Sequence, residues 1–392
     1  MLFTDPDVVQ GFNPRTGKPA GQPVPVSDLE TVDAAATAAA GAMSWSRWPA
    51  LERARVLDEI ADRLDTASDE LVELADAETG LGRPRLPGEV TRTTGQLRLF
   101  ARVLREGSFV DAIISPADTA AGQPDVRRMV QAIGPVAVFA ASNFPFAFSV
   151  AGGDTASALA AGCPVVVKAH EAHPSTSVRT AEIVHEAIAA AGAPGDIFKL
   201  VFGFAAGPAL VQHPAIRAAG FTGSLRGGRA LFDLAAGRPD PIPFYGELGS
   251  VNPSIVLPAA AASRPGEIAQ AYAASLTLGT GQFCTNPGLL FVPDDPVMLQ
   301  AAAAAIENAR GGPMLSSRIH EAFTTSSAAL SERAGLRLVA QGQTGDVEPG
   351  GWGATPPPLG TSCVVDANNV EANAGPPGCS GTFCCEGCEW ST

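Results

Sequence analysis

The chain has 392 residues, of which 46% are hydrophobic and 17% are charged, and its formal net charge is −14. That length can form two or three domains with sizeable cores, and the composition excludes a disordered chain. The sequence has no Lys/Arg cluster beyond short pairs such as Arg127-Arg128, which argues against nucleic-acid binding.

Residues 1–110 are predicted to form a helical lead-in. The segment Ser27–Glu30 (Ser-Asp-Leu-Glu) has the pattern of a capping box, in which the serine oxygen accepts a backbone N–H at the start of a helix. Farther on, apolar residues recur at helical spacing and predict a helix with one buried face. This stripe comprises Leu57, Ile60, Ala61 and Leu64.

The stretch Met129–Gly153 has no charged residue and is long enough to span a bilayer. It contains Gly134, Pro135 and Pro145, which interrupt an apolar helix. We therefore predict a buried strand followed by a loop, and no membrane association. Because the first residues lack a basic region followed by an apolar run, we expect no secretory signal and a cytoplasmic location.

From about residue 133, short apolar runs alternate with helical stretches such as Ser175–Ala191. Apolar runs without polar alternation indicate strands buried on both faces, and their repetition with helices implies a parallel sheet covered by helices. The fold class is therefore α/β. The predicted strands are Val136–Ala140, Val165–Lys168, Phe198–Phe202, Ala218–Phe221, Ser254–Leu257 and Leu289–Val292.

Cys284 lies in Gly281–Gly288 (Gly-Gln-Phe-Cys-Thr-Asn-Pro-Gly), just before a predicted strand. A lone cysteine is more often a small buried hydrophobe, as Cys163 in its apolar surroundings is expected to be. Glycines on both sides and polar neighbours instead indicate a loop that exposes a thiol. Such a thiol acts as a nucleophile when it is a thiolate, so Cys284 is the candidate nucleophile.

Two further side chains fit reaction chemistry. Glu247 lies between the apolar segments Ile242–Tyr245 and Val251–Val256, so we expect a partly buried carboxylate with a raised pKa that serves as a base, or else a solvated turn. Asn143 directly follows the strand Val136–Ala140. Its amide either caps the next helix or points at a developing oxyanion.

Nucleotide-type signals follow two predicted strands. Lys168 ends one strand and Glu171 follows three residues later. The segment Gly223–Gly228 (Gly-Ser-Leu-Arg-Gly-Gly) leads from another strand into a helix, where glycines let a helix N-terminus approach a pyrophosphate. A tight turn without a ligand is an equally good interpretation of this segment taken alone.

Five motifs, in this order, resemble those of the aldehyde dehydrogenase superfamily. They are Asn143-Phe-Pro, Pro164–Lys168 (Pro-Val-Val-Val-Lys), Phe221–Ser224 (Phe-Thr-Gly-Ser), Glu247–Gly249 (Glu-Leu-Gly) and Gly281–Cys284 (Gly-Gln-Phe-Cys). The resemblance runs from Asn13 to about Gly345. Within the superfamily, Gly246–Pro253 and Phe144–Ser149 look most like the α-ketoglutaric semialdehyde (2,5-dioxovalerate) dehydrogenases.

The resemblance implies a Rossmann-type parallel-sheet cofactor domain and a second α/β catalytic domain. We predict N-terminal helices with the NAD(P)-binding domain in residues 1–248, a partial catalytic domain in 249–348 and an irregular tail in 349–392. A small aldehyde, most simply a semialdehyde such as 2,5-dioxovalerate, is the implied substrate. The resemblance also implies a homo-oligomer, although the intersubunit strand of the family is not recognisable in this chain.

The resemblance implies a role for each candidate residue. Cys284 would form a thioester, Asn143 would hold the oxyanion, and Glu247 would activate the hydrolytic water. The cofactor-binding residues implied are Lys168, Glu171, Gly223, Ser224, Gly228 and Gly249. The Glu171 carboxylate favours NAD over NADP, because it accepts a hydrogen bond from a ribose 2′-OH and repels a 2′-phosphate.

Two other functions remain open from the sequence. One is a CoA-acylating aldehyde dehydrogenase, against which Glu247 argues, because acyl transfer to a thiol needs no water-activating base. The other is an inactive, truncated NAD(P)-binding relic. We expect no metal site, because the late cysteines provide one Cys-x-x-Cys spacing without a nearby histidine. Those cysteines are Cys379, Cys384, Cys385 and Cys388.

Past Glu348 the sequence loses helical and strand periodicity and becomes rich in Gly, Pro and Cys. The resemblance calls for a Glu-Val-Phe-Gly-Pro-type segment near residues 375–385, which this sequence does not contain. We therefore expect residues 349–392 to be a frameshifted or truncated end, and the chain to be aggregation-prone with weak or no activity. A genuine short form with its own tail is the alternative.

Overall fold

The protein was analysed as a computed structural model that describes residues 7–332, 337–345, 347–355 and 359–361. Its main body contains a five-stranded sheet in the order β7-β6-β5-β8-β9, in which all neighbours are parallel. The strands are β5 Val136–Phe139, β6 Val165–Lys168, β7 Phe198–Val201, β8 Ala218–Gly223 and β9 Phe244–Leu248. The predicted parallel α/β sheet is thus confirmed.

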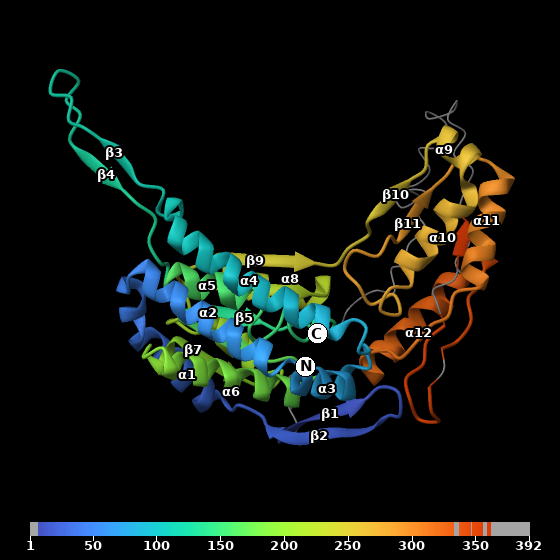
Figure 1. The fold of residues 1–392 in the computed structure, drawn as a ribbon, viewed down its shortest axis with the longest axis horizontal. Helices are drawn as coiled ribbons and strands as arrows, with labels where there is room; N and C mark the ends of the chain where they lie inside the picture. Colours follow the sequence, from blue (N-terminus) through green and yellow to red (C-terminus); the bar gives the residue numbers. More distant parts are fainter. Residues whose placement is uncertain (1–6, 333–336, 346, 356–358, 362–392) are drawn as a thin grey trace.

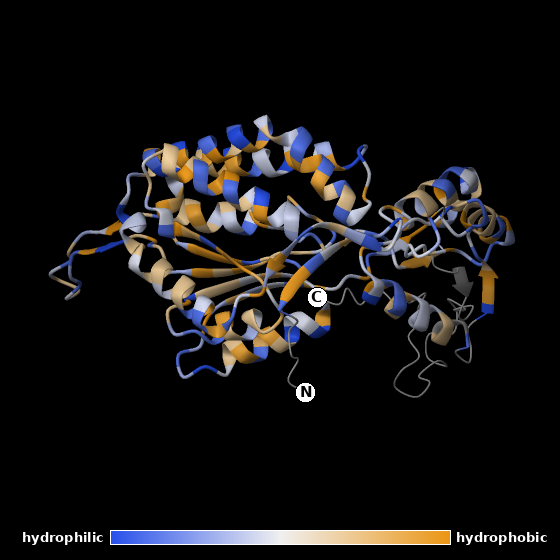
Figure 2. Ribbon diagram, turned by 90° about the horizontal axis from the view of Figure 1, so that it is seen from below, coloured by the Kyte–Doolittle hydropathy of each residue, from blue (hydrophilic) through white to orange (hydrophobic). Residues whose placement is uncertain are grey.

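Helices cover both faces of this sheet, and the hydropathy colouring shows apolar segments between the layers (Figure 2). On β6, Val165 and Val167 join one core while Val166 joins the other, as alternating strand side chains must. The first core includes α2 Ala50–Thr66, α3 Ser68–Thr79, α4 Leu86–Glu106, α5 Gly153–Ala161 and α6 Pro174–Ala190. The second includes α1 Leu29–Gly41, α7 Ala206–Gln212 and α8 Leu225–Ala236.

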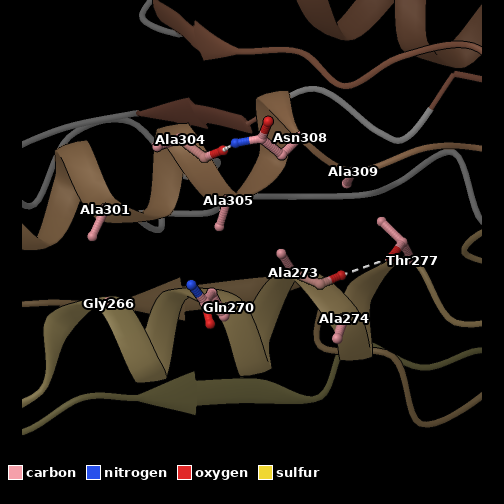
Figure 3. A pocket seen from close by; sticks show the side chains of 10 residues that line it. All are labelled: Gly266, Gln270, Ala273, Ala274, Thr277, Ala301, Ala304, Ala305, Asn308 and Ala309. Carbon is pink, nitrogen blue, oxygen red and sulfur yellow. Dashed lines mark hydrogen bonds between the residues drawn. The ribbon is translucent and has the colours of Figure 1, made fainter.

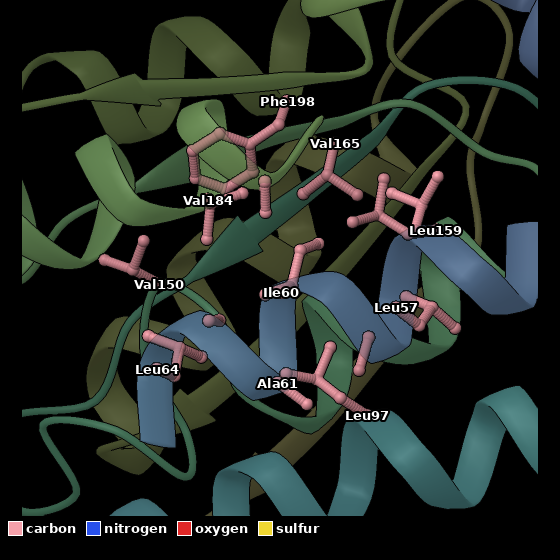
Figure 4. Close-up of a cluster of buried hydrophobic side chains, with 14 of the residues drawn as sticks. Leu57, Ile60, Ala61, Leu64, Leu97, Val150, Leu159, Val165, Val184 and Phe198 are labelled. Carbon is pink, nitrogen blue, oxygen red and sulfur yellow. The ribbon is translucent and has the colours of Figure 1, made fainter. Parts of the chain in front are cut away.

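The apolar stripe predicted on the second helix is the centre of the first core. Leu57, Ile60 and Leu64 of α2 are almost completely buried among residues of α4, α5 and β6 (Figure 4). Burial of each such side chain stabilises the fold by about 1.5–3 kcal/mol relative to an exposed position. This packing fixes α4, whose first turns approach the carboxyl edge of the sheet.

A second group of elements lies beside the main body (Figure 1). Its two strands β10 Pro253–Ile255 and β11 Leu289–Phe291 pair in parallel. Its helices are α9 Pro258–Ser263, α10 Pro265–Leu276, α11 Pro296–Glu307 and α12 Ser317–Ser331, and its last strands are β12 Arg337–Ala340 and β13 Leu359–Thr361. The predicted strand Ser254–Leu257 is shorter by two residues at its end, while Leu289–Val292 is found almost as predicted.

Helices α10 and α11 face each other through small side chains and leave a hollow of about 440 Å³ (Figure 3). Its lining includes Ala273, Ala304 and Ala305, and the polar side chains of Thr277 and Asn308 bond back to their own helices. The residues that line it include no titratable side chain. This hollow therefore offers no acid, base or nucleophile for a reaction.

The N-terminal part is not purely helical, contrary to the prediction. Strands β1 Val8–Asn13 and β2 Lys18–Pro25 form a hairpin within the predicted helical part. Beyond that part, β3 Ile113–Ser115 pairs with β4 Val126–Arg128 in a projecting arm (Figure 1). Pro19, Gly21 and Pro23 interrupt the apolar alternation of β2, which is why the sequence pattern missed it. Short 3-10 turns lie at Met43–Arg47, Ser108–Val110 and Gly195–Ile197.

The predicted capping box is shifted by one residue. Asp28, not Ser27, caps α1 and accepts a 2.8 Å hydrogen bond from the Thr31 N–H. The Ser27 hydroxyl instead accepts the N–H of Phe202, at the end of β7. Ser27 therefore makes a long-range hydrogen bond to Phe202 and does not cap the helix as its sequence pattern predicted.

Part of the predicted tail has defined contacts. The N–H of Trp352 donates to the Pro14 carbonyl, and its ring lies 6.1 Å from that of Phe12. Residues 362–392, including the late cysteines, lie outside the described residues. Within the described part, no helix combines the length and the apolar character that crossing a bilayer requires. Met129–Gly153 forms β5 and a loop, as predicted.

Candidate active site

The candidate residues gather at the carboxyl edge of the parallel sheet. Asn143 lies in the loop after β5, Lys168 ends β6, Gly223 ends β8, and Glu247 is the fourth residue of β9. After β5, the strands β6 and β7 are added on one side of β5, and β8 and β9 are then added on its other side. Ligands of open α/β sheets bind at such a switch point, outside the carboxyl ends of the strands.

Cys284 lies in the loop that joins α10 to β11, and its side chain is exposed and unpaired. Three successive residues before it have positive φ: Gly279 (59°), Thr280 (60°) and Gly281 (77°). A threonine in this region stores backbone strain, which is common beside functional groups. In this bend Gln282 is buried, whereas the Cys284 thiol two residues later is exposed, as the sequence predicted.

Asn252, the residue before β10, forms hydrogen bonds to the loop that contains Cys284. It is one of the non-glycine residues with positive φ, at 47°. Its side-chain amide donates to the backbone carbonyls of Cys284 (2.7 Å) and Asn286 (3.0 Å). These bonds fix both sides of the turn that presents the thiol, and sequence patterns gave no sign of them.

The structure brings Asn143 to the cysteine loop. Its buried Nδ2 donates a 3.2 Å hydrogen bond to the carbonyl of Gln282, two residues before Cys284. The Gln282 side chain is itself held, because its Oε1 accepts from the Leu315 N–H (2.9 Å) and its Nε2 donates to the Pro313 carbonyl (3.2 Å). Asn143 caps no helix, so the interpretation as a helix cap is wrong.

An ion pair on α4 supports the Asn143 loop. Glu89 accepts the N–H groups of Phe146 (2.9 Å) and Ala147 (3.2 Å), and Arg85 lies 3.6 Å from its second oxygen. Arg85 also donates to the backbone carbonyl of Asn143. Burial raises the pKa of Glu89, while these hydrogen bonds and Arg85 oppose that shift.

Sequence reasoning missed this pair. Charged residues on a helix usually form a solvated face, and Arg85 and Glu89 show only the common i, i+4 spacing. Their burial could have been predicted from their position on the helix. Arg85 and Glu89 lie on the same face as Leu86, Val90 and Leu97, which the amphipathic pattern assigns to the core. Charges on an apolar face indicate buried partners.

Glu247 is exposed, which contradicts the predicted partial burial. It lies on β9, the edge strand, and an edge strand lacks the second neighbour that would cover its side chains. A second carboxylate, Asp154 in the first turn of α5, lies close to it. Burial raises the pKa of Asp154, and the negative charge of Glu247 raises it further.

The residues expected to hold the adenosine ribose also meet. The Lys168 ammonium pairs with the Glu171 carboxylate, and Glu171 lines a cavity of about 250 Å³ with His170, Phe204 and Arg318. Burial keeps the pKa of His170 well below its usual range, so this ring is neutral. Glu171 Oε2 and His170 Nε2 are buried without a hydrogen-bond partner, which fits a site completed by a polar ligand.

The glycine-rich turn has the expected strand-to-helix form. Ser224 caps α8 by accepting the Gly227 N–H at 3.1 Å. The N–H of Gly249, whose φ is +64°, donates to the Gly223 carbonyl at 3.1 Å. A side chain on Gly228 would collide with Leu248, so a glycine lets α8 lie against β9. The N-terminus of α8 therefore faces the same edge as Lys168.

In the described residues, no group of three or more His, Cys, Asp or Glu side chains could hold a metal ion. The carboxyl edge of the parallel sheet offers an amide donor, two carboxylates and a dinucleotide-type turn, and the neighbouring loop, bonded to the amide, carries the thiol. These groups suit acyl chemistry on a cysteine.

Comparison with known sequences agrees with this geometry. The pattern of the aldehyde dehydrogenase family matches residues 3–340. α-Ketoglutaric semialdehyde dehydrogenase 2 of Azospirillum brasilense is 46% identical over 350 residues, covering 87% of this chain and 67% of the relative. An α-ketoglutaric semialdehyde dehydrogenase of Acinetobacter baylyi is 44% identical, covering 86% and 65%. The chain thus spans about two thirds of the length of these relatives.

Solved structures share the fold. Aldehyde dehydrogenase C of Pseudomonas syringae, in complex with NAD+ and octanal, superposes with a TM-score of 0.77 at 24% identity, covering 92% of this chain and 73% of that one. An NAD-dependent benzaldehyde dehydrogenase of Corynebacterium glutamicum gives 0.76 at 25% identity, covering 91% and 76%. The predicted family and fold are confirmed.

Proposed function

The chain belongs to the aldehyde dehydrogenase family, whose members oxidise small aldehydes with NAD(P), and we propose that it oxidises a semialdehyde to a carboxylate. The observation that carries the proposal is the exposed Cys284 thiol in a loop that is bonded, through the Gln282 carbonyl, to the Asn143 amide. The names of the two relatives favour 2,5-dioxovalerate as the substrate.

Each residue has a distinct role in the proposed reaction. The Cys284 thiolate adds to the aldehyde carbon, and the Asn143 amide with the Cys284 N–H stabilises the oxyanion of the hemithioacetal. One such donor lowers the barrier by about 3 kcal/mol. Loss of a hydride from the hemithioacetal to the bound cofactor would leave a thioester on Cys284. Glu247 would then take a proton from water, which attacks the thioester, releases the carboxylate and restores the Cys284 thiolate.

The cofactor would be held by Lys168 and Glu171 at the adenosine ribose and by Gly223, Ser224, Gly228 and Gly249 near the pyrophosphate. Bound NAD(P) supplies the hydride acceptor. We favour NAD, because the Glu171 carboxylate can accept a hydrogen bond from the 2′-OH and repels a 2′-phosphate. The buried, unpartnered Oε2 of Glu171 supports this preference.

A CoA-acylating reaction is the second candidate, since the same cysteine could pass its acyl group to a thiol. The exposed position of Glu247 at the sheet edge favours hydrolysis, because a solvent-facing carboxylate can draw on water directly. The domain division, a homo-oligomeric state, a cytoplasmic location and the weak activity expected from an altered end at residues 349–392 stay predictions.

The test is to mix the expressed chain with NAD or NADP and 2,5-dioxovalerate and to follow reduced-nicotinamide absorbance with and without CoA. Absorbance that rises without CoA, with carboxylate as the product, supports the proposal. A strict need for CoA indicates the acylating reaction. Cofactor binding without turnover indicates the NAD(P)-binding relic.

A further inference from the structure

Arg85, the N-cap residue of α4, and Arg92 of α4 lie against one aromatic ring. The guanidinium carbon of Arg85 is 4.8 Å from the centre of the Phe144 ring, and that of Arg92 is 5.6 Å from it. Arg92 also lies 4.9 Å over Phe148. The two arginines are seven residues apart, which places them on the same side of the helix, two turns from each other.

The phenylalanine rings connect the two arginines with the loop that carries the nucleophile Cys284. The centre of the Phe144 ring is 4.9 Å from that of Phe283, the residue before Cys284, and Arg85 lies 5.1 Å over the Phe283 ring. Arg85 is also close enough to Cys284 for a thiolate there to raise the pKa of the guanidinium, against the larger lowering by burial. Arg92, an exposed residue, stands farther out on the same aromatic surface.

The positive charge here exceeds the negative charge. Glu89 is buried and engaged by Arg85 and by two backbone N–H groups, so it neutralises one guanidinium. Among the described residues, Arg92 forms no ion pair within 4.0 Å. Nη1 of Arg85 is buried without a hydrogen-bond partner. Two guanidinium groups therefore share one carboxylate, Glu89, whose pKa both of them lower, and this local excess of positive charge contrasts with a formal net charge of −14 for the chain.

We propose that Arg92, with Arg85 behind it, is the specificity-determining residue that receives the acid end of the substrate. This inference rests on the proposed function and extends it to one substrate class: aldehydes with a carboxylate a few carbons from the aldehyde group. The planar guanidinium binds a carboxylate through two parallel hydrogen bonds. The methylene groups of the substrate lie against the phenylalanine rings.

The length of 2,5-dioxovalerate fits this arrangement. Four carbon–carbon bonds of about 1.5 Å separate its aldehyde and acid carbons, a span of roughly 5 Å. This span is close to the 4.9 Å between the centres of the Phe283 and Phe144 rings, so a substrate bound to Cys284 would extend along these rings toward Arg92, whose guanidinium carbon lies 5.6 Å from the centre of Phe144. An uncharged aldehyde of the same length lacks this contact.

The test uses alkylation of Cys284, which requires no turnover. N-Iodoacetylglycine carries a carboxylate four bonds from its reacting carbon, and N-iodoacetylglycinamide is its neutral counterpart. Rates of modification at Cys284 are measured by peptide mass mapping. The ratio of anionic to neutral reagent should fall about tenfold in Arg92→Gln, the loss expected for one charge-assisted contact. Arg102→Gln, an exposed arginine on the same helix about 15 Å farther along, should leave the ratio unchanged.

The outcomes separate this proposal from the proposed function. An unchanged ratio in Arg92→Gln, or an equal slowing of both reagents, overturns the acid-end subsite, because the first shows no contact and the second a structural effect. Steady-state assays supply the second arm: kcat/KM should fall about tenfold for 2,5-dioxovalerate and stay unchanged for pentanal. A chain that oxidises neither aldehyde refutes the proposed function, while the alkylation ratio still decides the role of Arg92.

Discussion

The side-chain amide of Asn143 is bonded to the backbone carbonyl of Gln282 at 3.2 Å. The donor proposed for the oxyanion is therefore already oriented at the cysteine loop. An amide held in place needs no reorganisation when the oxyanion forms, which is the condition under which such donors are most effective. An amide nitrogen carries two N–H groups, so one can keep its bond to the Gln282 carbonyl while the other donates to the oxyanion.

Replacement of Asn143 tests that role. We expect Asn143→Ala to lower kcat about 100- to 1,000-fold with little change in KM, since the contact forms in the transition state. Asn308→Ala is the matched control, because the Asn308 amide bonds to its own helix far from the thiol. A variant that loses affinity for the aldehyde but keeps kcat would show that Asn143 binds the ground state instead.

Replacement of the nucleophile should separate chemistry from cofactor binding. Cys284→Ala is expected to abolish aldehyde oxidation and to leave NAD(P) affinity nearly unchanged, because the thiol forms the acyl bond but holds no part of the turn at Gly223. Cys163→Ala should keep its activity, since Cys163 is buried in the apolar core. Turnover that survives in Cys284→Ala would refute the assignment of the nucleophile.

The central strands could be predicted because Val136–Phe139 and Val165–Val167 are uninterrupted apolar runs. Strand β9 was missed because Phe244–Leu248 contains Tyr, Gly and Glu and lacks such a run. The same edge position left Glu247 exposed. The loop around Cys284 was predictable from its glycines, because glycine readily takes positive φ.

The supports of the site could not be predicted in this way. Arg85 and Glu89 act on the loop 143–147, and Asn252 acts on Cys284, across long stretches of chain. Local patterns describe the element on which a residue lies, whereas these bonds depend on which elements meet. A three-dimensional arrangement was needed to find them.

Glu247 should control the second half of the reaction. We expect Glu247→Gln to release about one equivalent of reduced cofactor per site and then slow about 100-fold or more, because the thioester forms but is not hydrolysed. Intact-mass measurement should detect the acyl group on the enzyme. Glu267→Gln, on the exposed side of α10, is the control. Normal steady-state turnover without a burst would assign water activation to another group.

The cofactor preference depends on Glu171. We expect wild-type protein to have the higher kcat/KM with NAD, and Glu171→Gln to raise the NADP-to-NAD ratio about tenfold, because the substitution removes the negative charge and frees the Lys168 ammonium for a phosphate. Glu182→Gln, on exposed α6 surface, should change neither value. A clear NADP preference in the wild type would contradict the proposed role of the carboxylate.

Asp154 gives a pH-dependent prediction. Burial, with a further contribution from Glu247, raises its pKa in the folded protein above the ordinary 3.8. A carboxyl group whose folded pKa is raised favours the folded state only while it is protonated, so its contribution is present below pH 3.8 and is lost as pH rises through the folded pKa.

Asp154→Asn removes the ionisable group and hence this loss. Its Tm should therefore exceed that of the wild type at pH 7, and the difference should shrink as the pH falls toward 3.8, because the wild-type carboxyl then becomes protonated in the unfolded as well as in the folded state. Thermal unfolding followed by circular dichroism from pH 4 to 8 measures the difference. Asp294→Asn, in the exposed loop before α11, should show no such trend. A Tm difference that is constant with pH would mean that Asp154 affects packing and not charge.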